Sequence, residues 1–399
     1  VTTYQYNPDQ HCYWFGKPSA VIDPNGNISS AVCDQFGRLI EVRLPGDESG
    51  QPTTTVVYNH YLSAGSPANV IITRKINGSL AFSTRFFANG FGQVIQTQQL
   101  DVFEQGGVHK DLVQTTIYDT SGRKVKEESG FHAVNSGYGY QAIPPEDAVF
   151  VEFQYDQQDR IISVSNPNGT QTEDTYEIVY YLTTDWAPGQ YVLKHSHIDE
   201  NEHAQYQYTN VYGQVIESDP NSGDLKIGYQ YDLNGNLVKV YQSAAENASI
   251  DWLETTLQYD LAGRKTSMND PDMGTWLYSY DALGNLLTQQ DSRGVTTTLS
   301  YDLANRLTGK TFSSQSGVAT TAPITYIYDG INQTGYRTGM LDGSGSTTWQ
   351  YDTRGQIVSE NKTISGQGTF LTQWSYNSAG LPVSITYPEI GRASCRERV

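Results

Sequence analysis

Apolar and aromatic residues alternate with polar residues in short runs along this chain, and each run ends at residues typical of turns. Before Asp232, for example, Tyr229 and Tyr231 are separated by one polar residue, so both side chains would lie on the same face of a strand. The same spacing precedes other turns, at Tyr278/Tyr280, Tyr326/Tyr328, Trp349/Tyr351, Trp374/Tyr376 and Phe153/Tyr155. An apolar residue also follows six positions after the Tyr, at Leu237, Leu286, Leu307 and Ile357. This pattern predicts a succession of β-hairpins.

The turns between these strands follow one motif, Tyr-Asp-x-x-Gly-(Arg/Asn/Gln)-(Leu/Ile/Val), in about a dozen copies. Three copies have another residue in place of Tyr, at Cys33, Ala88 and Thr209. Between Tyr231 and Tyr376 the copies recur every 21 to 28 residues, and upstream they are more widely spaced. Self-similarity of this kind indicates a repeat protein. The residues assigned to the repeat turns are Asp34, Gly37, Asn89, Gly92, Tyr118, Asp119, Gly122, Tyr155, Asp156, Asn210, Gly213, Tyr231, Asp232, Gly235, Tyr259, Asp260, Gly263, Tyr280, Asp281, Gly284, Tyr301, Asp302, Asn305, Tyr328, Asp329, Tyr351, Asp352, Gly355, Tyr376 and Gly380.

The motif has a physical explanation as a hairpin turn. The Asp opens a type I turn, because its carboxylate can accept hydrogen bonds from backbone N–H groups two residues on. The Gly then takes the left-handed conformation that closes a three-residue loop with a bulge. Where the Gly is missing, the sequence has Asp159, Asn305 or Asn332, which are residue types that tolerate positive φ.

A second turn signal separates many of the units, as in Asp23-Pro24-Asn25-Gly26 and Asn166-Pro167-Asn168-Gly169. Each unit is therefore expected to be strand, turn, strand, turn. A single hairpin is at best marginally stable in water, so the units must stack in a continuous sheet. The predicted fold class is all-β, with tandem hairpins forming one long curling antiparallel sheet and the Tyr ladder packed as its core.

The regularity of the repeat divides the chain into regions. Residues 1–150 hold divergent, widely spaced copies with insertions, residues 151–250 hold copies around a polar insertion, and residues 251–388 form the regular array. Residues 389–399 fit no pattern upstream, and their first five residues are what the opening bases of a common sequencing adapter encode in one frame. We expect this last stretch to be an artefact, and the chain to be an internal piece of a longer protein.

Composition agrees with an all-β protein, because the 399 residues include 29 Tyr and 37 Gly, and only 17% are charged. The formal net charge of −18 opposes binding to nucleic acid or to an anionic membrane surface. No apolar run approaches the ~18 residues that indicate a membrane-spanning helix. Three cysteines, Cys12, Cys33 and Cys395, show no CxxC spacing, so they do not indicate a zinc site or a thioredoxin-like site.

A histidine cluster is the first candidate for chemistry outside the turns. His195, His197 and His203 lie in a short segment with three acidic residues. His195 and His197 would share a strand face, and His203 could complete a metal site. The alternative is a polar hairpin whose imidazoles and carboxylates are solvated.

Other candidate sites are explained by turn formation. Asp270 with Asp272, and Asp23 with Asn25 and Asn27, have an oxygen spacing similar to that of calcium loops, but neither supplies both the Gly and the Glu of an EF-hand. The sequence has no GxSxG elbow and no phosphate-binding loop. We therefore assign no catalytic residue, no cofactor and no metal ligand.

The repeated motif resembles that of the YD-repeat, or Rhs, family over nearly all of residues 20–388. The segment from Gly263 to Leu286 is also similar to the YD region of the B component of bacterial toxin complexes, the SpvB/TcdB-like proteins. The resemblance implies repeats wound into a hollow shell that holds a partly unfolded, toxic C-terminal segment until delivery. It places the chemistry outside the repeats, in a self-cleaving aspartyl core domain and in the toxin, and we find neither in this sequence.

The resemblance therefore predicts a structural, non-enzymatic shell fragment of a toxin-delivery protein that is secreted or on the bacterial cell surface. Its predicted partners are the enclosed toxin segment and other toxin-complex subunits. An alternative from another class is a secreted or cell-surface adhesin that binds glycans through the aromatic repeats. A hydrolase is a third hypothesis, which only the 43 acidic residues support.

Overall fold

The computed structural model describes residues 2–8, 11–47, 51–59, 67–77, 80–105, 108–128, 130–134, 139–141, 149–181, 189–220, 226–243 and 252–388. Residues 389–399, including Cys395, lie outside this part of the chain. By its contacts the chain divides into two compact units. Unit 1 comprises residues 1–115, 130–147 and 324–399, and unit 2 comprises residues 116–129 and 148–323.

Unit 1 consists of antiparallel strands and one short helix, α1 (His11–Trp14), among its described residues. Strands β1 to β9 pair one after another in chain order, and β9 also pairs with β11. Strands β26 to β31 pair in the same sequential way. The strands are β1 (Thr3–Gln5), β2 (Ala20–Ile22), β3 (Ile28–Cys33), β4 (Leu39–Arg43), β5 (Thr54–Asn59), β6 (Ala68–Asn77), β7 (Leu80–Ala88), β8 (Val94–Gln105), β9 (Val108–Tyr118), β11 (Phe131–Val134), β26 (Ile324–Gly330), β27 (Gln333–Asp342), β28 (Gly345–Tyr351), β29 (Ile357–Ile364), β30 (Gly368–Tyr376) and β31 (Pro382–Thr386).

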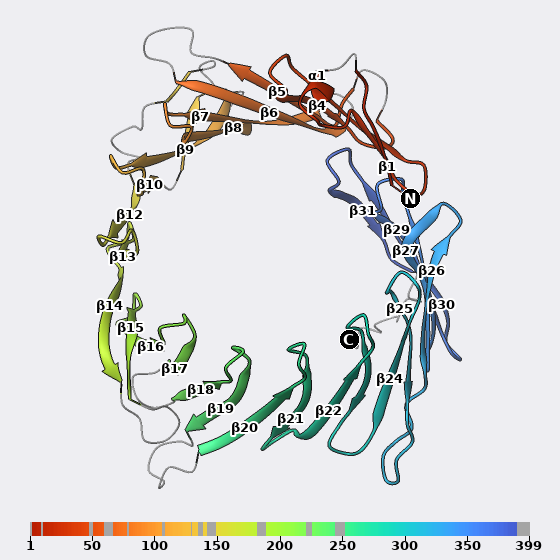
Figure 1. Cartoon of the computed structure of the whole chain (residues 1–399). Coiled ribbons are helices and arrows are strands. Elements are labelled where there is room, and N and C mark those ends of the chain that lie inside the picture. The colour runs from red at the N-terminus through yellow and green to blue at the C-terminus, as the bar shows by residue number, and fades with distance from the viewer. Residues whose placement is uncertain are drawn as a thin grey trace, which may run out of the picture. The chain divides into compact units, whose positions relative to one another are not determined.

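Unit 2 is a sequential antiparallel sheet of the same kind, and Figure 1 shows its successive strands side by side. It begins at the end of β9, which pairs with β10, and β10 pairs with β12. From β12 to β25 each strand pairs with the next. The strands are β10 (Lys124–Glu128), β12 (Phe150–Tyr155), β13 (Ile161–Ser165), β14 (Gln171–Tyr181), β15 (Gln190–Ile198), β16 (Ala204–Thr209), β17 (Val215–Asp219), β18 (Ile227–Tyr231), β19 (Leu237–Ser243), β20 (Trp252–Tyr259), β21 (Lys265–Asp270), β22 (Gly274–Tyr280), β23 (Leu286–Gln290), β24 (Thr296–Tyr301) and β25 (Leu307–Phe312). The prediction of an all-β fold of tandem antiparallel hairpins is confirmed.

A β-bulge marks the motif in most hairpins. In the β22–β23 pair, Ser279 lies opposite Thr288 while Tyr280 lies opposite Leu286, so β23 has one extra residue at this point. The same register shift immediately precedes Tyr231, Tyr259 and Tyr301. A type I turn followed by a left-handed Gly creates this bulge, because the loop shifts the register of the return strand by one residue.

The Tyr ladder is half-buried, so it is neither the packed core that was expected nor a fully exposed aromatic platform. Along β22 the residues alternate, with Tyr278 and Tyr280 half-buried and Leu277 and Ser279 exposed. Strands of unit 2 make extensive contact only with their neighbours in the sheet, so no second layer of described elements closes over the rings. The few apolar residues that are buried in the described part of the chain are Cys12, Cys33, Phe87, Val113, Phe131, Val192, Ile216 and Tyr241.

Candidate functional site

The carboxylate of the motif Asp holds each turn in its conformation. In the turn between β22 and β23, Asp281 Oδ1 accepts hydrogen bonds from the backbone N–H groups of Leu283 (2.9 Å) and Asn285 (2.8 Å). The N–H of Asp281 donates to the carbonyl of Asn285, and the N–H of Gly284 donates to the carbonyl of Asp281. One side chain therefore satisfies backbone donors that the turn removes from the strand ladder.

The turn ends at a residue with positive φ. Asp159, Asn305 and Asn332, which stand where the motif lacks Gly, have φ of 61°, 59° and 57°. These are the residue types that tolerate the left-handed region at low cost. The motif glycines with positive φ are Gly37, Gly92, Gly122, Gly213, Gly235, Gly263, Gly284, Gly355 and Gly380.

The unit headed by Tyr328 departs from this geometry. Gly330 pairs with Gln333, so β26 and β27 are joined by a tight turn of Ile331 and Asn332. Asp329 itself has a φ of 62° and accepts a hydrogen bond from a backbone N–H beyond the turn rather than opening a three-residue loop. The three-residue loop expected here is therefore wrong, because the strands continue pairing past the position of the Asp.

In many of the turns the side chain that follows the Gly also forms a hydrogen bond with the side chain that opens the turn. Arg264 donates from Nε to Asp260 Oδ2 at 2.7 Å. Where the turn opens with Asn210 instead of Asp, the matching residue is Gln214, whose Oε1 accepts from Asn210 Nδ2 at 2.9 Å. The partners of Asp260 and Asp281 are thus donors, and those of Asn89 and Asn210 supply an acceptor. The turn opened by Asn377 instead has Leu381 at this position, which contributes its backbone N–H alone. The motif lists Arg, Asn and Gln at this position, but this coupling was not recognised from the sequence.

The same contacts favour the charged form of the motif carboxylates. The backbone N–H of Arg264, followed by its guanidinium, holds the pKa of Asp260 below its usual value. The backbone N–H and guanidinium of Arg306 lower the pKa of Asp302 in the same way. These carboxylates therefore act in the turns as ionised hydrogen-bond acceptors.

The hydroxyl of the motif Tyr joins its hairpin to the preceding one. Tyr280 donates to the backbone carbonyl of Lys265 at 2.8 Å, and Tyr301 donates to that of Leu286 at 3.0 Å. In both cases the acceptor is the first residue of the return strand of the preceding unit, and burial raises the pKa of both tyrosines. Equivalent bonds run from Tyr155 to Lys124, from Tyr231 to Val215, from Tyr351 to Arg337 and from Tyr376 to Ile357.

Cationic side chains from adjacent strands or turns lie over the half-buried rings. Lys265 Nζ lies 4.6 Å from the centre of the Tyr278 ring, and the Arg264 guanidinium lies 4.9 Å from that of Tyr280. Arg337 lies 4.7 Å from the centre of the Trp349 ring. Cation–π attraction and the aliphatic stems of these residues cover part of the aromatic surface.

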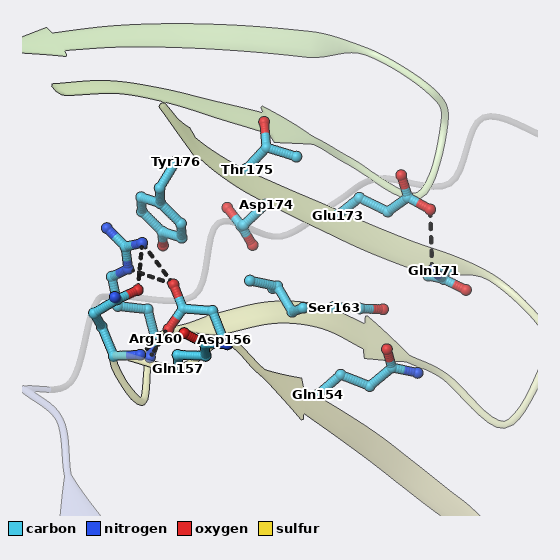
Figure 2. Close-up of a pocket in the computed structure, with 12 residues that line it drawn as sticks. Gln154, Asp156, Gln157, Arg160, Ser163, Gln171, Glu173, Asp174, Thr175 and Tyr176 are labelled. Atoms are coloured by element: carbon cyan, nitrogen blue, oxygen red, sulfur yellow. Dashed lines mark hydrogen bonds and ion pairs between the residues drawn. The ribbon is translucent and has the colours of Figure 1, made fainter. Parts of the chain in front are cut away.

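A hollow of about 560 Å³ lies beside the turn that joins β12 to β13 (Figure 2). Asp156 and Arg160 of the turn are paired, and the Arg160 guanidinium lies 4.0 Å from the centre of the Tyr176 ring. The ring of His195, on β15, stacks on Tyr176 with centroids 4.6 Å apart. The Glu173 carboxylate accepts a hydrogen bond from Gln171 (Figure 2). The acids in this hollow thus already have partners within the sheet.

The histidine cluster separates into two hydrogen-bonded groups. His195 Nε2 and His197 Nδ1 lie 2.7 and 2.9 Å from the same oxygen, Asp174 Oδ1. His203 instead pairs with Asp199, which opens its own turn. Across the described residues, no group of three or more His, Cys, Asp or Glu side chains has a geometry that could hold a metal ion. Asp23 and Asp270 likewise accept hydrogen bonds from backbone N–H groups of their own turns.

Two features of unit 1 were not found from the sequence. Cys12 and Cys33 form a disulfide that ties α1 to the end of β3, where Cys33 replaces the motif Tyr. Arg354, at the tip of a later turn, donates to the carbonyl of Pro45 at 2.9 Å and pairs with Asp47 at 3.0 Å. Both depend on which distant segments meet, and no local pattern in the sequence encodes that.

Residues 275–316 match the family described as RHS Repeat. This stretch carries an RHS repeat. The matched stretch covers most of β22 and all of β23 to β25, the part in which the motif is most regular, and the resemblance drawn from the motif is confirmed. No curated protein sequence matches the chain.

Solved structures of TcdB2-TccC3 and of a Tc holotoxin show the same fold. A crystal structure of TcdB2-TccC3-TEV superposes with a TM-score of 0.76 at 15% identity, over 97% of this chain and 25% of the other. A structure of the Photorhabdus luminescens Tc holotoxin pore carrying the mutation TccC3-D651A gives a TM-score of 0.76 at 15% identity, with the same coverage. The chain thus spans about a quarter of the length of the structures it matches, and its sheet is like that of the Tc toxin shell.

Proposed function

We propose that the chain is part of the wall of a secreted RHS shell that encloses a toxic polypeptide segment before delivery. The observation that carries the proposal is its likeness to TcdB2-TccC3 over 97% of its length. The hydrogen bonds from motif tyrosines to the preceding hairpin support it further, because they join successive hairpins directly within the described part of the sheet. A wall built in this way can be extended by adding repeats. Regions 1–150, 151–250 and 251–388 would be successive stretches of that wall.

The proposed role is structural and not catalytic. The motif carboxylates accept backbone and guanidinium hydrogen bonds in their own turns, as Asp260 does. In the polar hollow beside Tyr176, Asp156 pairs with Arg160, Asp174 with His195, and Glu173 accepts a hydrogen bond from Gln171. Engaged carboxylates of this kind support turn formation rather than acid–base chemistry.

The proposed location is outside the cytoplasm. The Cys12–Cys33 disulfide supports this, because disulfides persist in oxidising compartments. We expect the purified chain to show no free thiol at these two positions under non-reducing conditions, as measured by alkylation and mass spectrometry. Quantitative alkylation of both cysteines in protein isolated from cultures of the native host would contradict the proposed location.

The proposed partners are a cargo segment of the same protein and other toxin-complex subunits. A long sequencing read through and beyond codon 388 is the first test, and it should continue into more repeats followed by an unrelated C-terminal segment. Limited proteolysis of the complete gene product should then leave that segment intact while the same segment expressed alone is digested. A segment digested equally fast in both contexts would rule out enclosure.

Glycan binding by the aromatic repeats is the alternative, and the ring environments do not favour it. Tyr176 has Arg160 and His195 against its ring, and Tyr278 has Lys265 over it. A sugar that stacks on these rings would have to displace those side chains. We therefore expect no saturable binding of the chain across a broad glycan array.

A further inference from the structure

The most completely buried polar side chains in unit 1 lie on one face of β7, β8 and β9. Two cross-strand rows are formed there, Phe87–Gln96–Thr115 and Arg85–Gln98–Val113, as the strand register requires. Each of these six side chains is at most 3% exposed. Buried polar side chains require hydrogen-bonding partners, so the Arg, Gln and Thr side chains of this face must find them within the sheet or in a segment packed against it.

Those partners include the backbone of Gly139–Gln141. Gln96 Nε2 donates to the carbonyl of Gln141 at 2.8 Å, and Gln96 Oε1 accepts from the backbone N–H of Gln141 at 2.9 Å. Gln98 Nε2 donates to the carbonyl of Gly139 at 3.0 Å. Between these two points the Tyr140 ring packs edge-on against Phe87, with centroids 5.8 Å apart.

The two glutamines are held in place by the residues around them. Arg85 donates to Gln98 Oε1 at 2.9 Å, and Gln98 Nε2 donates to Gln96 Oε1 at 2.9 Å. Gln96 Nε2 also donates to Thr115 Oγ1 at 3.0 Å. The side-chain amide orientations are therefore fixed by contacts within the sheet as well as by the segment 139–141, as expected of a preorganised binding site.

The contacts to this segment from Gln96 and Gln98 go to its backbone atoms and not to its side chains. A primary amide offers one acceptor and two donors, so Gln96 can pair with the N–H and C=O of one extended residue as a neighbouring strand would. Such recognition does not depend on sequence, apart from the place for an aromatic ring against Phe87. Any extended polypeptide with a suitably placed aromatic residue has the chemistry to bind here.

We propose that the β7–β9 face is a binding site for an extended polypeptide, occupied in this chain by its own residues 139–141. The proposal rests on the proposed function, because the ligand that such a site would serve is the unfolded segment enclosed by the shell. In that role, Gln96 and Gln98 bind the cargo backbone when it replaces residues 139–141, and Phe87 receives its aromatic side chains.

The test uses the full chain and a fluorescent peptide with the sequence of residues 138–142, Tyr-Gly-Tyr-Gln-Ala. The variant Gln141→Pro removes the N–H that donates to Gln96, so it weakens the internal ligand while leaving the face itself unchanged. We expect fluorescence anisotropy to show peptide binding to Gln141→Pro that is about tenfold or more tighter than binding to the unchanged chain. Circular dichroism and the thermal midpoint establish that the variant is folded.

The decisive controls are made on the peptide, so they cannot alter folding. Methylation of the Gln backbone nitrogen should weaken binding about tenfold, because the bond to Gln96 Oε1 is lost. Replacement of the Gln side chain by Ser should leave binding within about twofold, because the side chain is not recognised. Equal binding of the methylated and parent peptides, or no binding to the folded Gln141→Pro variant, would overturn the proposal. Either result would leave the protease-protection test of enclosure unaffected, because that test concerns the complete gene product.

Discussion

At the scale of single residues, each repeat contains a turn in which different residues have different structural roles. The Asp side chain satisfies the backbone N–H groups, the residue with positive φ reverses the chain, and the residue after it closes the turn onto the Asp. The first two roles follow from the sequence, because Asp, Gly and Asn have well-defined local preferences. The third role could be inferred only once the structure showed that Asn89 and Asn210 pair with Gln.

Gly284 allows the conformational requirement to be tested cleanly. A Cβ at this position would meet no atom within 4 Å, so a substitution acts through its φ of 92° alone. We expect Gly284→Val to lower the free energy of unfolding by roughly 1–3 kcal/mol, and Gly284→Asn to cost less. Urea denaturation measures both, with Leu283→Ser as the control because that side chain is 75% exposed. Equal effects of Val and Asn would show that the left-handed conformation is not required.

The ionised turn carboxylates make stability depend on pH. Because the pKa of Asp260 is lowered in the folded chain, its contribution is present above the unfolded value of about 3.9 and is lost as the pH falls through the folded pKa. Several turns share this feature, so we expect the urea midpoint to be nearly constant from pH 7 to 5 and to fall steeply below about pH 4.

A matched double substitution separates this effect from general acid unfolding. Asp260→Asn combined with Arg264→Gln reproduces the uncharged pairing seen at Asn210 and Gln214. We expect the double variant to lose less stability on acidification than the unchanged chain, and the single variant Asp260→Asn to be less stable than the double variant at pH 7. An identical pH profile for the double variant would contradict the assigned role of Asp260.

At the scale of elements, the hairpins were predictable because their signals are local. The period of two fixes the strands, and the motif fixes the turns and bulges, as in the β22–β23 pair. The burial of the ladder was overestimated, because the same-face spacing of Tyr278 and Tyr280 does not reveal whether a second layer covers them. The contact of residues 139–141 with Gln96 and Gln98 was not predictable either. Its hydrogen bonds join positions 41 and 45 residues apart in the sequence, and no recurring pattern marks them.

The tyrosine bridge between hairpins can be tested within one strand. Tyr280→Phe removes the donor to the Lys265 carbonyl, and we expect a loss of about 1 kcal/mol in the free energy of unfolding. Tyr278 lies two residues away on the same face and makes no hydroxyl hydrogen bond within the described residues, so Tyr278→Phe is the matched control. Thermal or urea unfolding that does not distinguish the two variants would remove the bridge as a source of stability.

At the scale of the whole molecule, each unit is held by a different set of long-range contacts. In unit 1, segments more than 300 residues apart in the sequence meet, since Arg354 binds Asp47 and Asn25 donates to the carbonyl of Thr334. In unit 2, the extensive contacts are between strands that are adjacent in the sheet. Unit 2 should therefore behave more like an open repeat array, whose stability is a sum over neighbouring hairpins.

The Arg354–Asp47 pair is the clearest long-range contact to remove. The Asp47 side chain is 3% exposed and that of Arg354 is 16% exposed, so breaking the pair leaves a buried charge without its partner. We expect Arg354→Ala to cost roughly 3 kcal/mol in unfolding free energy. Arg43→Ala, which breaks the more exposed pair with Glu41, should cost about 1 kcal/mol or less. Similar costs for the two variants would mean that the distant segments are not held together at Arg354.

The tyrosine bridge also bears on how such a protein changes length over generations. Its acceptor is a backbone carbonyl, which every residue type supplies. A hairpin can therefore form this bond with a neighbouring hairpin of any sequence. After duplication or deletion of a unit, the next Tyr hydroxyl would therefore still find a backbone carbonyl to which it can donate. Gene recombination within the array could then enlarge or shrink it in whole hairpins without redesigning any junction.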